Sequence, residues 1–134
     1  MRRSLSLCLV LALSCVFSVT AYSQYRDDEH KRRLDVLRYG IETQVIELIN
    51  TLTSEKNKDY TEDLLPIFDT VTSPRLRSAI LDYYSMLELD LAASRAAAIV
   101  ANRDETPDTL VGTAFSYLLT LKSDAALDHA RRII

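Results

Sequence analysis

Apolar residues recur three and four positions apart along almost the whole chain beyond residue 23. This spacing is typical of helices that bury one stripe of side chains, because residues three and four apart share a helix face. Runs of β-branched residues in strict alternation do not occur, and the chain contains only two glycines, Gly40 and Gly112. The pattern therefore predicts an all-α protein.

Seven helices are predicted from this pattern and from the residues that interrupt it. They are expected over residues 28–39, 41–54 and 61–71, from Ser73-Pro74 onward, over residues 90–102, from Thr106-Pro107 onward, and over residues 124–134. The apolar stripe of the second predicted helix consists of Ile41, Val45, Leu48, Ile49 and Leu52. The stripe of the fourth consists of Leu76, Ile80, Tyr83, Tyr84 and Leu87.

The ends of several predicted helices carry residues that suit helix caps. Gly40 stands where a left-handed residue can end the first helix. Thr61 and Ser73 are expected to accept hydrogen bonds from the first free amides of the third and fourth helices. Pro74 suits the first turn, where its missing N–H costs nothing. Thr106-Pro107 is expected to open the sixth helix in the same way.

An internal repeat relates the segment 76–100 to the segment 110–134 without a gap. The corresponding pairs include Tyr83 and Tyr117, Asp90 and Asp124, and Ala96 and Ala130. Each aspartate is expected to cap the helix that follows it, and the alanines are expected to permit close helix contacts. A fixed period of this length predicts stacked helical hairpins, because one hairpin cannot bury its own apolar face. Chance similarity between two hairpins is the alternative.

The second copy of the repeat stops at Ile134, which corresponds to Val100 within the first helix of a hairpin. We therefore expect the chain to be a fragment, or a truncated reading frame, of a longer repeat protein. The uncovered face at Ile133-Ile134 would then be open to self-association with a second copy of the chain.

The stretch LLPIFDTVTSPRLRSAILDYYSMLE, residues 64–88, resembles a HEAT repeat. The resemblance consists of a proline inside the first helix (Pro66), a short turn that ends at Pro74, and a second helix that opens with Leu76-Arg77. In the second copy Val111 replaces the arginine. The resemblance implies an α-solenoid of stacked antiparallel hairpins whose surface binds other proteins.

Tetratricopeptide repeats are the alternative, because they recur with the same period of about 34 residues. Tyr117, Ala126 and Ala130 fit the packing positions of that family, whereas Pro66 fits them less well. Both families are α-solenoids.

The segment 1–23 is predicted to be a secretory signal peptide. Arg2 and Arg3 precede an uncharged apolar run of about 15 residues, which is shorter than the roughly 20 that cross a bilayer as a helix. Ala21-Tyr22-Ser23 places the cleavage before Gln24. The chain is thus divided into a signal peptide at 1–23, a helical hairpin and linker at 24–58, and HEAT-like repeats at 59–134, with the last repeat incomplete.

Both cysteines, Cys8 and Cys15, lie inside the predicted signal peptide, so the exported chain would have no disulfide. The residues before Cys15 resemble a loose bacterial lipobox, but Ala12 and Leu13 stand in the wrong order, and lipid anchoring is not expected. We expect export to the periplasm or the extracellular space, with no membrane span after cleavage.

The charge balance argues against polyanionic partners. Loss of Arg2 and Arg3 with the signal peptide takes the formal net charge from −3 to −5. Binding to nucleic acid or to an anionic membrane surface depends on lysine and arginine. We therefore expect a protein partner and no nucleic acid.

Residue types that carry catalysis or bind metals are scarce. The two histidines, His30 and His129, are far apart in the sequence, and each stands among charged residues as expected on a solvated helix. No metal motif surrounds either histidine, and two glycines cannot form a glycine-rich phosphate loop. The sequence predicts no catalytic, cofactor-binding or metal-binding residues, no cofactor and no enzymatic activity.

Tyrosine is the enriched residue type, with six tyrosines beyond the predicted cleavage site: Tyr25, Tyr39, Tyr60, Tyr83, Tyr84 and Tyr117. Tyrosine is favoured at interfaces, but Tyr83 and Tyr117 are equivalent in the repeat and are predicted to lie in the core. Tyr84 is predicted to be at least partly buried.

Together these patterns predict a non-catalytic, extracytoplasmic scaffold for protein–protein interactions. Two alternatives stay open: a scaffold segment of a longer enzyme whose catalytic part lies outside this sequence, and a tetratricopeptide-type binding module. The abrupt end at Ile134 also leaves open a truncated product without function.

Overall fold

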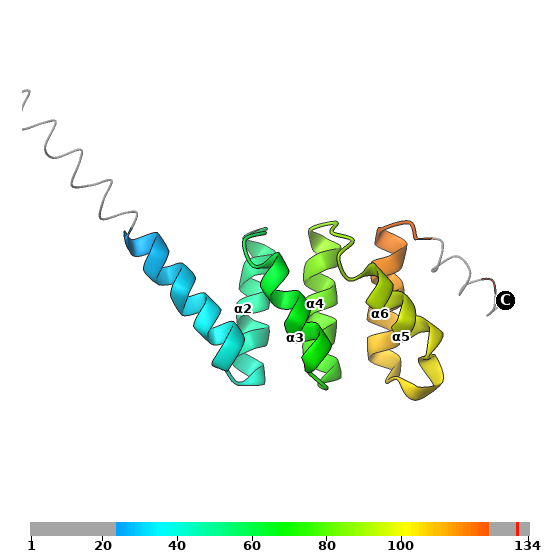
Figure 1. The fold of residues 1–134 in the computed structure, drawn as a ribbon. Helices are drawn as coiled ribbons and strands as arrows, with labels where there is room; N and C mark the ends of the chain where they lie inside the picture. The colour runs from blue at the N-terminus through cyan, green and yellow to red at the C-terminus, as the bar shows by residue number, and fades with distance from the viewer. Residues whose placement is uncertain (1–23, 124–130, 132–134) are drawn as a thin grey trace, which may run out of the picture.

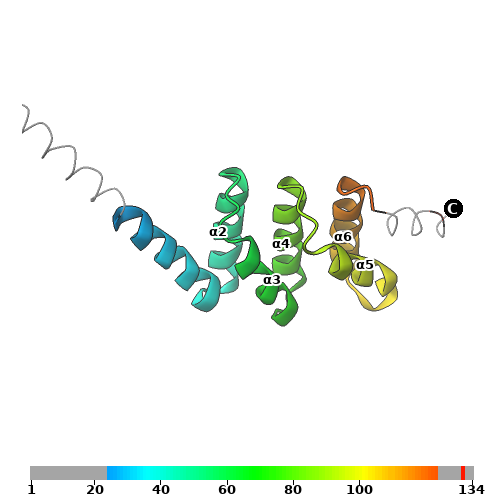
Figure 2. The ribbon, with the colours of Figure 1, turned by 45° about the horizontal axis from the view of Figure 1, so that its top comes forward.

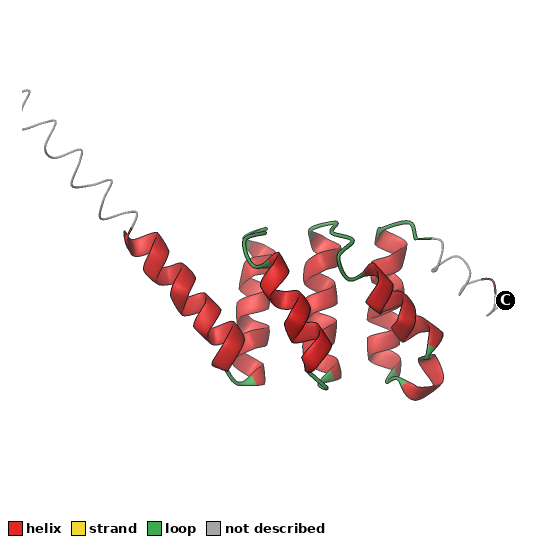
Figure 3. Ribbon diagram, in the orientation of Figure 1, coloured by secondary structure: helices red, strands yellow, loops and turns green. Residues whose placement is uncertain are grey.

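The computed structural model describes residues 24–123 and residue 131, and every regular element in these residues is helical. Residues 24–39 form the first described helix. It is followed by α2 (Glu42–Ser54), α3 (Thr61–Thr70), α4 (Pro74–Met86), α5 (Ala93–Ala101), the short 3-10 helix η1 (Arg103–Glu105) and α6 (Asp108–Thr120). Figure 3 shows helices joined by short loops over this part of the chain. The prediction of an all-α protein is confirmed.

The helices form two layers. Helices α2, α4 and α6 lie side by side in a row, and α3 and α5 lie on one side of that row (Figures 1 and 2). Helix α4 packs against both α2 and α6, α3 packs against α4, and α5 packs against α6. The helix at 24–39 precedes α3 and α5 in their layer and leans away from the others toward its N-terminal end (Figure 1). No helix in the described part of the chain is both long enough and apolar enough to span a bilayer.

A single apolar core runs between the two layers and includes three fully buried tyrosine rings. Tyr83 and Tyr117 are buried as predicted, and so is Tyr84, whose hydroxyl donates a 2.6 Å hydrogen bond to the Thr61 carbonyl. Buried aromatic rings contribute a large apolar area, and their hydroxyls need a partner. Backbone carbonyls supply that partner here.

The three helices of the row end in the same way. Lys56, Glu88 and Lys122 follow these ends with φ of 52°, 53° and 55°, which is the left-handed region. The next amide in each case reaches back to a carbonyl in the last turn of the helix, from Asn57 to Leu52, from Leu89 to Tyr84, and from Ser123 to Leu118. This is the Schellman arrangement. Its recurrence at nearly equal intervals makes α2, α4 and α6 structural copies, each 13 residues long.

The copy that includes α2 and α3 is not evident in the sequence. The buried apolar residues in α3 and at its N-cap are Tyr60, Leu64 and Phe68, and the buried residues at the corresponding positions of α5 and its N-cap are Ala92, Ala96 and Val100. The two sets occupy the same three helical positions, but one is bulky and the other small. Sequence comparison alone therefore missed the correspondence.

The second predicted stripe is correct except at its first residue. Val45, Ile49 and Leu52 are buried, and Leu48 is partly buried. Ile41, however, is 66 % exposed, because it precedes α2 as the N-cap residue in an extended conformation and so does not share the helical face.

Gly40 is not a left-handed cap, since neither glycine has a positive φ. Its amide donates a 2.8 Å hydrogen bond to the Val36 carbonyl. A Cβ at this position would lie 2.5 Å from that same carbonyl oxygen, which is closer than carbon and oxygen can approach without displacement. Gly40 is therefore required by a close contact rather than by its backbone angle.

Two predicted side-chain caps are wrong. Thr61 is the first residue of α3, and its hydroxyl donates 2.6 Å to the Lys58 carbonyl instead of accepting from the helix. Asp90 lies three residues before α5, and its backbone carbonyl accepts from the Ala93 amide; α5 has no side-chain cap. In both places a backbone carbonyl of the loop accepts from the first amide of the helix, Lys58 from Thr61 and Asp90 from Ala93.

The prediction for Ser73 is confirmed, since its hydroxyl oxygen accepts from the Leu76 amide at 3.3 Å and Pro74 is the first residue of α4. Thr106-Pro107 does not repeat this cap. Helix α6 begins at Asp108 after Pro107, and the Thr106 hydroxyl donates 3.0 Å to the Asn102 carbonyl of the preceding turn. Pro66 lies inside α3, as predicted.

The other helix boundaries differ from the prediction by a few residues. The first helix already includes residues 24–27, α3 ends at Thr70, and α5 is shorter than residues 90–102 at both ends. The predicted signal peptide at 1–23 lies outside the described residues. So does most of the last predicted helix, including Asp124, Ala130 and Ile133-Ile134, whereas Arg131 is helical and exposed.

Candidate functional site: a groove between the first two hairpins

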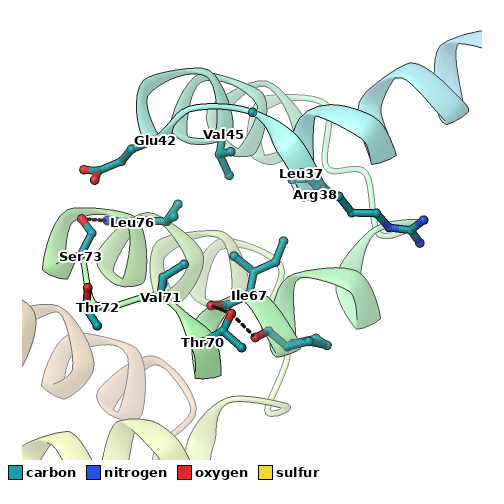
Figure 4. A pocket seen from close by; sticks show the side chains of 12 residues that line it. Leu37, Arg38, Glu42, Val45, Ile67, Thr70, Val71, Thr72, Ser73 and Leu76 are labelled. Carbon is teal, nitrogen blue, oxygen red and sulfur yellow. Dashed lines mark hydrogen bonds between the residues drawn. The ribbon is translucent and has the colours of Figure 1, made fainter.

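A groove of about 620 Å³ lies where the helix at 24–39 and α2 meet α3 and α4 (Figure 4). Its floor is apolar and consists of Leu37, Val45, Ile67, Val71 and Leu76. Its rim is polar and includes Arg38, Glu42, Thr70, Thr72 and Ser73. A concave apolar surface with a few polar groups at its edge is the usual form of a binding site.

The floor results from the periodicity that builds the core. Leu37, Val45 and Leu76 belong to the buried stripes of their helices, and the groove exposes only their outer edges. Ile67 and Val71 lie one helical turn apart at the end of α3 and are only partly covered by the core. The first hairpin (the helix at 24–39 and α2) and the second hairpin (α3 and α4) therefore leave part of their shared apolar surface open.

Two of the hydroxyl groups of the rim, those of Thr70 and Ser73, have partners inside the protein. The Thr70 hydroxyl donates to the Pro66 and Ile67 carbonyls at 3.0 and 3.2 Å, and the Ser73 hydroxyl oxygen accepts from the Leu76 amide. These bonds keep the turn between α3 and α4 in one shape. Thr72 is exposed between them.

Two charged side chains stand at different ends of the groove in Figure 4. Glu42 is exposed in the first turn of α2 and forms no ion pair with the residues that the structure describes. At the other end, the side chain of Arg38 is 58 % exposed and lies 3.8 Å from the Asp63 carboxylate, which is a long contact for an ion pair. An exposed pair of this kind holds its partners only weakly.

The surface between the second hairpin (α3 and α4) and the third hairpin (α5 and α6) is more polar at the equivalent place. When the copies are aligned so that the left-handed residues Lys56 and Glu88 match, Leu37 corresponds to Asp69 and Val45 corresponds to Arg77. Asp69 accepts two hydrogen bonds from Arg95 on α5, at 2.5 and 2.6 Å, and this contact lowers the pKa of the Asp69 carboxyl. The Arg77 guanidinium lies over the Phe68 ring, 5.4 Å from its centroid. Charged side chains thus take the place of two residues of the apolar floor, Leu37 and Val45.

Two smaller hollows are lined mainly by charged and polar side chains. One, of about 530 Å³, lies at the start of α6 and includes Arg103, Asp104 and Asp108. The other, of about 310 Å³, lies between the helix at 24–39 and α2 and includes Glu29, Arg32 and Arg33. Neither has a continuous apolar floor, so the groove at Val45 and Leu76 is the strongest candidate.

The contact between the helix at 24–39 and the first loop holds one side of the first hairpin in place. Arg33 donates to Glu29 at 2.9 Å and to both oxygens of Glu55 at 2.7 and 3.0 Å. These bonds raise the pKa of the Arg33 guanidinium and lower the pKa of the Glu55 carboxyl. His30 Nδ1 lies 2.9 Å from the Tyr60 hydroxyl in the same region.

Neither histidine is part of a chemical centre in the described structure. His30 is exposed and contacts the Tyr60 ring, with the ring centroids 5.0 Å apart. His129 lies outside the described residues. Within residues 24–123 and at residue 131, no group of three or more histidine, cysteine, aspartate or glutamate side chains could hold a metal ion.

The groove itself was not predicted from the sequence. Its residues come from four helical segments, and its opening depends on how far the first hairpin stands from the second. The replacement of Val45 and Leu37 by Arg77 and Asp69 in the next copy would have been the only sequence signal, and it requires the register between the copies to be known.

Comparisons with protein family models, with curated proteins and with solved structures each find no match.

Proposed function

We propose that the chain is an α-solenoid of stacked antiparallel hairpins that serves as a non-catalytic scaffold for protein binding. The row of α2, α4 and α6 with its recurring left-handed caps supports stacking, since each copy adds its second helix beside the previous one. The proline inside α3 and the Ser73-Pro74 cap are features of the HEAT-like form. The spacing of α4 and α6 along the chain would also suit a tetratricopeptide-type module.

The main support for this proposal is the groove, which has an apolar floor and a polar rim. A scaffold binds partners through surfaces that are apolar at the centre and polar at the edge, because burying the centre drives association and the edge sets specificity. The groove between the first two hairpins has this form. After removal of residues 1–23, the proposed scaffold would work outside the cytoplasm.

The proposal is tested by selecting binders from a phage-displayed random peptide library on the full chain. Enriched clones are then measured against Thr72→Trp, which places a large ring on the rim of the groove. Ser116→Trp is the matched control, because Ser116 is exposed on α6, outside the groove. We expect clones that bind the unchanged chain and the Ser116 variant but not the Thr72 variant. Binding that is unaffected by Thr72→Trp would contradict a function of the groove.

A further inference from the structure

We propose that the groove binds a polypeptide segment with an apolar residue on the floor, a basic residue beside Glu42 and an acidic residue beside Arg38. This inference rests on the proposed binding function and adds the chemistry of the partner. It follows from the separation of the two rim charges along an apolar floor (Figure 4).

Glu42 supplies the end that would accept a basic side chain. Its carboxylate is exposed at the start of α2, and no lysine or arginine of the described chain pairs with it. Helix α2 has no basic residue in its last turn, and its other acidic residue, Glu47, lies outside the groove. A lysine or arginine of the partner beside Glu42 would therefore meet a carboxylate that has no competing partner.

Arg38 supplies the opposite end. Its guanidinium has five donors, and the single 3.8 Å contact with Asp63 leaves most of them open to solvent. A carboxylate of the partner would match the planar fork of donors better than this long contact does. A bound acidic residue would thus add to the pair with Asp63 or replace it.

The floor between the two charges determines what lies in the middle of the segment. Val45, Val71 and Leu76 are aliphatic, so a charged or strongly polar side chain over them would lose its hydration without gaining a partner. An aliphatic or aromatic side chain would instead bury its surface there. The predicted order along the partner is therefore basic, apolar, acidic when it is followed from Glu42 to Arg38.

The test reverses one charge. The same random peptide library is selected in parallel on the unchanged chain and on Glu42→Lys, which leaves a basic residue at both ends of the groove. The control is Glu47→Lys, which makes the same change at an exposed position of α2 outside the groove. Circular dichroism and thermal unfolding confirm that each variant is folded, because Glu42 also complements the dipole of α2.

We expect clones from the unchanged chain to place opposite charges on the two sides of an apolar residue, and clones from Glu42→Lys to carry acidic residues on both sides. A synthetic peptide from the first selection should lose about fivefold in affinity on Glu42→Lys, as expected when one rim charge pair becomes a repulsion. Its counterpart with the basic residue replaced by an acidic one should gain affinity there, and Glu47→Lys should bind like the unchanged chain.

Two results would overturn the inference. Clones that depend on the groove, as judged by Thr72→Trp, but show the same charges on both selections would remove the charge rule and leave the binding function intact. Absence of any groove-dependent clone would remove both.

Discussion

Tyr83 and Tyr117 occupy the same position in successive hairpins and make the same hydrogen bond. Tyr83 donates 2.6 Å to the carbonyl of Asn57, and Tyr117 donates 2.5 Å to the carbonyl of Leu89. Each acceptor directly follows the left-handed residue that ends the preceding helix of the row. Each helix of the row thus holds the capped end of its neighbour, and this repeated contact joins α2 to α4 and α4 to α6.

Removing one of these hydroxyls should weaken the protein at a single contact. Tyr117→Phe keeps the buried ring but leaves the Leu89 carbonyl without this donor, so the free energy of unfolding should fall by about 1–2 kcal/mol. Urea denaturation measures the change. Tyr39→Phe is the control and should be neutral, since Tyr39 is 82 % exposed. Equal stability of the Tyr117 variant and the unchanged chain would show that the hydrogen bond contributes nothing.

The buried tyrosines also predict sensitivity to alkaline pH. Burial raises the pKa of Tyr117 to about 12 and also raises the pKa of Tyr60, Tyr83 and Tyr84. The unfolded chain loses these protons at lower pH than the folded chain. The contribution of the buried tyrosines to the free energy of unfolding is therefore fully present below the ordinary tyrosine pKa of about 10, and it is lost as pH rises toward 12.

Phenolate absorbance and circular dichroism, followed together during an alkaline titration, measure this effect. We expect the phenolate signal of the buried rings to appear with the loss of helix. Ionisation of all the tyrosines while the helical signal stays intact would contradict their burial.

Ala96 lies on the buried face of α5. Its side chain is fully buried, and α5 packs against α6. Ala96→Leu should overfill this contact and lower the free energy of unfolding by about 1–3 kcal/mol. Ala98→Leu makes the same change on the exposed side of the same helix and should have little effect. If both variants unfold at the same urea concentration, the assignment of Ala96 to the buried side of α5 and of Ala98 to its exposed side is wrong.

The left-handed residues predict a substitution that stabilises the protein. Glu88 is exposed and has φ of 53°, a conformation that costs a residue with a side chain more than it costs glycine. Glu88→Gly should therefore raise the free energy of unfolding by about 0.5–1 kcal/mol, after allowing for the greater flexibility of glycine in the unfolded chain. Lys58→Gly, in a loop residue without a positive φ, should bring no gain. A loss of stability in the Glu88 variant would contradict the cap.

The sequence was sufficient for features that depend on local spacing. Apolar periodicity located the helices and placed Tyr83 and Tyr117 in the core, and the Ser73-Pro74 pair marked the start of α4. The caps predicted at Thr61 and Asp90 are wrong because the Thr61 hydroxyl donates to the Lys58 carbonyl and the first amide of α5 is bound by the Asp90 backbone carbonyl. Such partners depend on the path of the loop, which the local sequence does not determine.

The groove could not be predicted because it depends on the relative placement of two hairpins. Val45 and Leu76 read as ordinary core positions in the sequence, and both are indeed buried. Only the structure shows that their outer edges line an opening between α2 and α4. The left-handed caps, which the local sequence does not reveal, are needed to align the copies and so to see that Asp69 and Arg77 replace two apolar residues of the groove.

In the proposed stack of hairpins α4 and α6 lie side by side, and a disulfide cross-link tests this arrangement most directly. The Ser85 and Thr120 hydroxyl oxygens are 3.2 Å apart, so cysteine sulfurs at these positions need to move only about 1 Å closer to reach the S–S bond length of about 2 Å. In the full chain with Cys8 and Cys15 replaced by serine, the pair Ser85→Cys with Thr120→Cys should form an intramolecular disulfide readily. The pair Ser54→Cys with Thr120→Cys should not, because α4 stands between α2 and α6. Failure of the first pair to cross-link, or equal cross-linking of both, would contradict the stacked arrangement.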